Sequence, residues 1–254
     1  MLALPRSARL AAWAAGWLAG EVSLGDVVAR VQGDDEPHLV KDVPARSEPT
    51  SLATALGDAR ANGARAMLVA LPRPGDPNGL AGPGELTVAA VQAGEAVLAL
   101  GAPCALVPSV QTFGPPGDQG HLVTWTWHDA VPPHAWPSRA DAERELSEAM
   151  ITAGLALANL DVASWRPEVA QLLDDLRSDQ TGEPLPRMFP PPAQALAARA
   201  ARVLAVVSVA LDDDGGALTA AATRRAALLP LERAARHALA AACNVLAEVP
   251  PPLA

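Results

Sequence analysis

The residues best suited to bind a ligand lie in a loop rich in glycine and proline, between Arg73 and Glu85. Glycine lets a backbone approach a bound molecule closely, and Asp76 and Asn78 add polar side chains. The apolar run Ala66–Leu71 before the loop predicts a buried strand, and a helix is expected from Glu85. Open parallel sheets bind ligands where such strands end. The candidate ligand-binding residues are therefore Arg73, Asp76, Asn78, Gly79, Gly82 and His128.

The same loop does not carry a phosphate-binding motif. Its glycines lack the G-x-G-x-x-G spacing of dinucleotide-binding loops, and no Lys-Ser or Lys-Thr pair follows them as in a P-loop. Glu85 stands at the start of the predicted helix, where a bound anion would need the positive end of the helix dipole. The alternative interpretation is a surface loop, because turn chemistry alone accounts for most of its residues.

Three histidines and an aspartate follow within a short stretch of the chain, at His121, His128, Asp129 and His134. A metal site needs such side chains to converge on one point. In the predicted strand 122–129, however, His128 and Asp129 point to opposite faces, and the other two histidines lie in flanking loops. The pattern predicts no metal site and no cofactor. His128 is the best single candidate for proton transfer, since its face also carries two threonines.

No nucleophile has a catalytic setting in the sequence, and whether the chain is an enzyme stays open. A G-x-S-x-G motif is absent, and Cys104 follows a proline in an apolar stretch without an adjacent base. Cys104 and Cys243 are expected to be small buried residues, with a disulfide as the alternative. The segment Asp212–Gly216 lacks the spacing of a calcium loop and is expected to end a helix.

The predicted secondary structure that positions these residues changes near Pro137, from strands and helices to helices alone. We expect an α+β fold, with an α/β sheet domain over 1–136 and a helical domain over 137–254, or a helical layer packed on the sheet in one single domain. The sheet is predicted to be mixed and five-stranded, with a parallel βαβ core and a terminal antiparallel hairpin. Helices are predicted near 6–19, 23–31, 51–62 and 85–93, and strands near 38–43, 66–71, 96–100, 105–110 and 122–129.

The first helix and the last strand carry most of the tryptophan. Arg6 and Arg9 before an apolar run imitate a signal peptide, but the apolar spacing predicts an amphipathic helix capped by Ser7. Its expected apolar stripe is Leu10, Trp13, Ala14, Trp17 and Leu18. In the last strand Val123, Trp125 and Trp127 share one face, which we expect to pack against this helix. The alternative for these tryptophans is an aromatic pocket or an interface.

The second half of the chain carries only helix signals. Ser138 and Asp141 form a predicted capping box, a second helix is expected over 167–177, and a proline-rich linker over 178–192. Helical stretches follow at 193–211, 219–229 and 230–248, where Pro230 either starts the last helix or kinks a longer one. Their scattered arginines are expected to be solvated: Arg199, Arg202, Arg224, Arg225, Arg233 and Arg236.

Composition limits the function classes. The chain of 254 residues carries a net charge of −9 with no basic segment, which argues against nucleic acid as a partner. No convincing membrane span is present in the sequence, and a cytoplasmic location is expected. The sequence favours a non-catalytic binding or protein-interaction module, with an unknown protein partner or self-association into a homo-oligomer. The alternative is a small-molecule-binding enzyme or sensor with its site in the loop 73–85.

Overall fold

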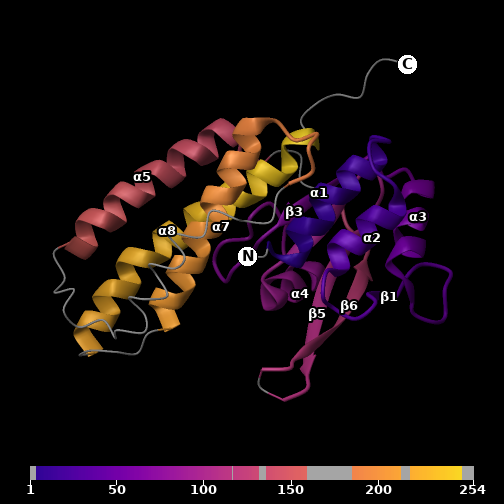
Figure 1. The fold of residues 1–254 in the computed structure, drawn as a ribbon, viewed down its shortest axis with the longest axis horizontal. Helices are drawn as coiled ribbons and strands as arrows, with labels where there is room; N and C mark the ends of the chain where they lie inside the picture. The colour runs from indigo at the N-terminus through magenta and orange to yellow at the C-terminus, as the bar shows by residue number, and fades with distance from the viewer. Residues whose placement is uncertain (1–3, 116, 132–135, 159–184, 213–217, 248–254) are drawn as a thin grey trace. The chain divides into compact units, whose positions relative to one another are not determined.

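The computed structural model describes residues 4–115, 117–131, 136–158, 185–212 and 218–247 (Figure 1). The chain divides into two compact units. The sheet unit holds Pro5–Trp136 together with Leu185–Phe189 and Cys243–Ala254, so it takes in two segments from the far end of the chain. The helical unit holds the remainder, mainly Pro137–Pro184 and Pro190–Ala242.

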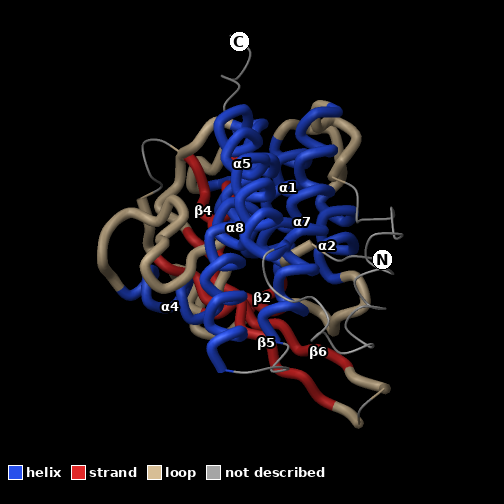
Figure 2. Tube along the Cα trace, turned by 90° about the vertical axis from the view of Figure 1, so that its left-hand side faces the viewer, coloured by secondary structure: helices blue, strands red, loops and turns tan. Residues whose placement is uncertain are grey.

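The sheet unit is built on a six-stranded sheet with the order β2-β1-β6-β5-β4-β3 (Figure 2). Of its neighbouring pairs, β1 and β6 are parallel and the others are antiparallel. The longest pair is the β5–β6 hairpin, which is in register from Ala105 opposite His128 to Phe113 opposite Gly120. The strands are β1 (Leu39–Lys41), β2 (Thr50–Ser51), β3 (Ala66–Ala70), β4 (Ala96–Leu100), β5 (Ala105–Phe113) and β6 (Gly120–His128).

The expected α+β class, the mixed sheet and the antiparallel hairpin are confirmed, but the parallel βαβ core is wrong. β3 pairs with β4 antiparallel, with Ala70 opposite Ala96, so both ends of their connection lie at the same end of the sheet. The chain turns back in the long loop before α4 (Glu85–Ala93), and α4 therefore does not cross the sheet as a βαβ helix must. The strand count is six because Thr50–Ser51, at the start of the predicted helix 51–62, adds a short edge strand that was not predicted.

Three helices precede the strands β3 to β6 in the chain: α1 (Arg6–Leu18), α2 (Leu24–Gln32) and α3 (Leu52–Ala61). α2 begins at a complete capping box between Ser23 and Asp26, and Ser51 caps α3 as expected. The expected Ser7 cap of α1 is wrong, because the helix begins one residue after Pro5 and Ser7 lies buried inside it. α1 packs against β3, β4 and β5 and against α2.

Most of the buried residues of α1 are small. Leu10 and Ala14 are buried as expected, together with Ser7, Ala8, Ala11, Ala12 and Gly16. Trp13 and Trp17, expected in the core, are only half-buried, and the guanidinium groups of Arg30 and Arg60 lie over their rings at 5.1 and 5.0 Å. The buried face predicted for Val123, Trp125 and Trp127 is confirmed.

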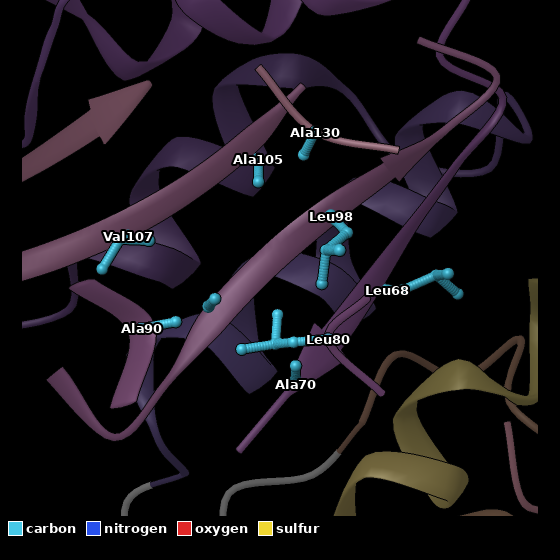
Figure 3. Close-up of a cluster of buried hydrophobic side chains, with 9 residues drawn as sticks. Leu68, Ala70, Leu80, Ala90, Leu98, Ala105, Val107 and Ala130 are labelled. Carbon is cyan, nitrogen blue, oxygen red and sulfur yellow. The ribbon is translucent and has the colours of Figure 1, made fainter. Parts of the chain in front are cut away.

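A separate apolar cluster joins the sheet to α4 and to the loop before it (Figure 3). Leu68 of β3, Leu98 of β4 and Val107 of β5 supply the sheet side. Leu80 of the loop and Ala90 of α4 cover them. The loop 73–85 is therefore anchored to the sheet by burial of apolar surface through Leu80.

The helical unit contains α5 (Arg139–Ala158), α7 (Pro191–Asp212) and most of α8 (Leu218–Asn244). Ser138 and Asp141 make the expected capping contacts, and Pro230 lies inside the longer helix α8. Arg224 and Arg236 are buried, so the expectation that all of these arginines are solvated is wrong for these two. The predicted helix 167–177 and residues 178–184 of the predicted linker lie outside the described residues.

One described stretch, Pro191–Leu211 of α7, is long and apolar enough to cross a membrane by length and composition. This is weak evidence, because a core helix of a soluble protein passes the same test. Within the helical unit, the Arg199 guanidinium of this stretch donates to the Ser147 hydroxyl of α5 at 2.8 Å. That hydrogen bond ties a charged residue of α7 to a neighbouring helix.

Candidate functional site

The polar residues of the loop 73–85 are engaged with main-chain groups around the loop. Arg73 Nη1 donates to the carbonyl oxygens of Gly94 at 3.1 Å and Pro72 at 3.2 Å. Gly94 ends α4 in a left-handed conformation, so Arg73 places a positive charge at the C-terminal end of that helix. The Asn78 side chain donates to the carbonyl of Leu71, which follows the edge strand β3, at 3.1 Å.

The rest of the loop is closed by short turns. Arg73 and Asp76 exchange two main-chain hydrogen bonds of 2.9 Å, and Asp76 is buried. Gly79 has a φ of 88° next to Asn78 at 42°, the left-handed region that glycine adopts without strain. The Gly82 carbonyl accepts a hydrogen bond from the Thr87 hydroxyl at 2.7 Å. Because β3 and β4 are antiparallel, the argument from the carboxyl edge of a parallel sheet no longer applies, and ligand binding here stays a prediction.

The histidines of the predicted proton-transfer region lie apart. His128 ends β6 opposite Ala105, and its Nε2 is buried with no hydrogen-bond partner among the described residues. His121 lies near the other end of the hairpin, where its Nδ1 is 3.2 Å from the Thr112 hydroxyl. His134 lies outside the described residues. Within the described part of the chain, no group of three His, Cys, Asp or Glu residues could hold a metal ion.

A buried polar network that the sequence analysis missed centres on His38, just before β1. The indole N–H of Trp125 donates to His38 Nδ1 at 3.2 Å. Because an indole N–H can only donate, Nδ1 must be the acceptor, and the ring proton lies on Nε2. That nitrogen lies 3.2 Å from Asp35 Oδ2, to which it donates. Arg6 completes the network with two hydrogen bonds to the Asp35 carboxylate, of 2.7 and 2.6 Å.

The protonation states in this network follow from burial and from its partners. Burial lowers the pKa of His38, against the opposing effect of the hydrogen bond to Asp35. Burial alone would raise the pKa of Asp35, but the bonds from Arg6 and His38 hold it below its usual range. Both ring nitrogens of His38 are occupied, so the ring has no free nitrogen for a substrate. The only sequence signal was an aspartate three residues before a histidine at the start of a strand.

A second missed contact replaces the absent side-chain cap of α1. The Ser7 N–H, in the first turn of α1, donates to the carboxylate of Glu95 at 2.7 Å. The two residues are 88 positions apart, and Glu95 directly precedes β4. Burial raises the pKa of Glu95, while the contacts with Ser7 and the nearby Arg6 oppose the rise. Its carboxylate occupies the positive end of the α1 dipole.

The two thiols are likewise poorly placed to react. Cys104 and Cys243 are both unpaired and buried, which confirms the expectation of small buried residues. Burial raises the pKa of each thiol to about 12. At neutral pH the reactive thiolate form is therefore scarce at both positions.

The outer part of the β5–β6 hairpin contrasts with these closed groups, and we call it the arm: Ser109–Phe113 with Gly120–Val123. Ser109–Phe113 are all exposed, although each stays paired with β6. Val110, Phe113 and Leu122 are exposed apolar side chains at 39, 45 and 46%. Figure 1 shows the two strands continuing as a ribbon past α4 of the same unit. The Phe113 ring lies over Gly120, its cross-strand partner, where a larger side chain would not fit.

One contact at the sheet edge shows toward which neighbour the N–H and C=O groups of β3 and β4 point. Val69 donates to the Asn244 side-chain oxygen at 2.8 Å, and its carbonyl accepts from the Asn244 amide at 3.0 Å. Val69 therefore points its main-chain groups away from β4. Bonded and non-bonded pairs alternate along an antiparallel ladder, so Val97, opposite Val69, must bond toward β5. The bond of 2.7 Å from the Ala99 N–H to the Cys104 carbonyl agrees with this assignment.

The same alternation identifies the free groups of β5. Leu106, opposite Val97, forms its hydrogen bonds toward β4, and the main-chain groups of the alternate residues Pro108, Val110 and Thr112 face the same side of β5. β4 pairs with β5 only at Ala105 and Leu106. The N–H and C=O groups of Val110 and Thr112 therefore face outward along an edge that no described strand covers. Pro108 fits its place in this row because proline has no N–H to leave unpaired.

Comparison with known protein families covers both halves of the chain. The family described as Rv1486c-like protein, N-terminal domain, matches residues 7–141, and Rv1486c-like protein, C-terminal domain, matches residues 140–240. Comparison with curated proteins and comparison with solved structures each gave no match. The first family match contains the whole six-stranded sheet and the arm, and the second contains α5 except its first residue, α7 and most of α8. The chain therefore belongs to the family of Rv1486c-like proteins.

Proposed function

We propose that this protein is a non-catalytic protein-interaction module that binds its partner along the β5–β6 arm. The observation that carries the proposal is the arm itself, a paired ribbon with exposed apolar side chains at Val110, Phe113 and Leu122. By the register, Phe113 and Leu122 lie on one face of the ribbon and Val110 on the other, and neighbouring exposed apolar side chains are typical of interaction surfaces. A free strand edge beside them offers directional hydrogen bonds to an incoming strand.

Apart from His128, the candidate polar groups are already engaged or buried, which supports the non-catalytic part of the proposal. His38 uses both ring nitrogens, Arg73 and Asn78 bond to main-chain carbonyls, and the two thiols are buried. A catalytic group needs a free atom within reach of a substrate. The proposal also places the protein in the cytoplasm, where unpaired thiols such as Cys104 and Cys243 are ordinary.

Site-specific photo-crosslinking in the native host tests the proposal. A photoreactive phenylalanine analogue replaces Phe113 on the arm or, in the control, Val88 of α4, which is 58% exposed but lies outside the arm. We expect a defined adduct from position 113, identified by mass spectrometry, and only background from position 88. Equal background at both positions would contradict an interaction through the arm.

A further inference from the structure

The partner of the arm can be inferred from its main-chain groups and its lack of charge. We propose that a second copy of this chain pairs with it, β5 edge against β5 edge, antiparallel about a two-fold axis. The inference rests on the proposed function of the arm and names its partner. It joins the two sheets of the dimer into one continuous sheet.

In one register, the free N–H and C=O groups of β5 pair fully with the same groups of the second copy. Val110 and Thr112 each present an outward N–H and C=O, and they are separated by Gln111. If the two-fold axis passes through Gln111, Val110 lies opposite Thr112 of the partner subunit. That pair exchanges both of its hydrogen bonds, and symmetry repeats the exchange on the other side of the axis. Every outward group of Val110 and Thr112 is then satisfied.

Other registers leave outward groups of Val110 or Thr112 unpaired. With the axis through Val110, Pro108 would face Thr112 of the partner subunit, and proline has no N–H to donate. With the axis through Thr112, Val110 would face Gly114 of the partner subunit, which lies beyond the end of β5. The register about Gln111 also sets Ser109 opposite Phe113 of the partner subunit, which shields part of that exposed ring.

The charge distribution favours a second copy over a charged partner. The chain carries a net charge of −9, yet the segment Ala105–Gly117 contains no charged residue. Edge strands are commonly protected from self-pairing by lysine or other charged side chains. Within β5 the only residue that hinders self-pairing in this way is a proline, Pro108, and it stands before the exposed stretch Ser109–Phe113. An uncharged edge fits an uncharged edge without like-charge repulsion across the contact.

The strength of the contact is limited by its size. A short strand pair buries less surface than a standard stable interface, so we expect a dissociation constant on the order of 10 to 100 µM. The dimer should therefore form and dissociate within the concentration range of an ordinary sedimentation experiment. It should weaken little with salt, because no ion pair is part of it.

Sedimentation velocity over a concentration series of the full chain tests the inference. Val110→Pro removes an outward N–H without removing a bond to β6, as native Pro108 does at an equivalent position, and Val110→Lys adds a charge to the edge. Each should weaken the dimer at least about tenfold, because hydrogen bonds are lost symmetrically or like charges meet. Val110→Thr, which keeps the N–H and the branched side chain, should dimerise like the native chain.

Amide hydrogen exchange at Val110 and Thr112 locates the contact. Both amides should gain protection as protein concentration rises, and Val110→Lys should abolish that gain at Thr112 while the amides of β6 stay protected. A strictly monomeric native chain, or a dimer indifferent to Val110→Pro and Val110→Lys, would overturn the inference. If the purified chain is monomeric but position 113 crosslinks to a different protein, the inference fails and the proposed function stands. If the chain is monomeric and position 113 gives no crosslink, both fail.

Discussion

The contact between Asn244 and Val69 gives the sharpest test of the structure. Asn244 is buried, and its amide makes two hydrogen bonds to the main chain of the edge strand β3, at 2.8 and 3.0 Å. Asn244→Asp keeps the size of the side chain and the acceptor for the Val69 N–H. It replaces the donor that faces the Val69 carbonyl with a second oxygen.

The expected cost follows from the groups involved. Loss of one buried hydrogen bond that leaves its acceptor unpaired costs about 1 to 3 kcal/mol, and a charged oxygen facing that acceptor costs more. Asn244→Ala leaves both Val69 groups without this partner and should cost about 2 to 5 kcal/mol at any pH. In Asn78→Ala the loss of a single hydrogen bond to Leu71 should cost less, about 0.5 to 1.5 kcal/mol, and backbone strain of alanine at the left-handed φ of 42° adds about 1 to 2 kcal/mol.

The pH dependence separates Asn244→Asp from Asn244→Ala. When the introduced carboxyl is protonated, its O–H can donate to the Val69 carbonyl and restore the contact. Its folded-state pKa is therefore raised above the unfolded value of about 3.9, so the contact is present below that pH and lost as pH rises through the folded-state pKa. The free-energy difference between Asn244→Asp and the native chain should shrink on acidification, while that of Asn244→Ala should stay constant.

Hydrogen exchange at the Val69 amide is the measurement, because it reports the sheet unit separately from the helical unit. Urea unfolding followed by tryptophan fluorescence gives the corresponding free energy. The reasoning would be refuted if Asn244→Asp matched the native chain in Val69 protection and in unfolding free energy at neutral pH. A cost for Asn244→Asp that did not change with pH would refute the protonation argument alone.

Three further predictions concern the buried carboxylate, the histidine and the arm. Glu95→Ala should destabilise the sheet unit by about 1 to 3 kcal/mol because the Ser7 N–H loses its acceptor, whereas Glu95→Gln, which keeps one, should cost less in urea unfolding. His38 has a lowered pKa, so the unfolded chain binds more protons below about pH 6.5; stability should fall as pH drops from there toward the folded-state pKa, and His38→Gln should remove that part of the slope. Gly120→Ala should displace the Phe113 ring and speed amide exchange in the arm, and unchanged exchange would contradict the cross-strand contact.

The local elements could be predicted from the sequence because their signals are local. α4 runs from Glu85 to Ala93, as its flanking glycines and the glutamate indicated, and β4 matches the apolar run Ala96–Leu100. Ser51 and Ser138 cap helices as their positions predicted. Such signals depend on a few neighbouring residues, and packing did not override them.

Strand direction could not be predicted in the same way. The apolar run Ala66–Ala70 reads the same whether its neighbour is parallel or antiparallel, since both faces are buried in either case. The preference for a βαβ unit came from the helix between two strands, but the long loop before α4 returned the chain to the end where β3 stops. The candidate ligand residues depended on that direction, so their placement beside a parallel edge failed with it.

The polar network around His38 and the Ser7–Glu95 contact were missed because in each case one decisive pair is distant in sequence. Trp125 and His38 are 87 positions apart, and Glu95 and Ser7 are 88 apart. Each residue alone is unremarkable: a tryptophan in a buried strand face, a histidine at a strand start, a glutamate after a glycine. Only the sheet order, which sets β1 beside β6, brings Trp125 to His38.

The hydrogen bonds from Asn244 to the edge of β3 also have a consequence for synthesis on the ribosome. Asn244 follows Val69 by 175 residues, so the ribosome completes β3 long before it makes the side chain that satisfies its edge. At about 5 to 20 residues per second, that interval lasts roughly 9 to 35 s. During this time the main-chain groups of Val69 are open to pairing with another nascent chain. We expect a chaperone that binds extended apolar segments to occupy β3 in this interval and to leave once the C-terminal end of α8 emerges.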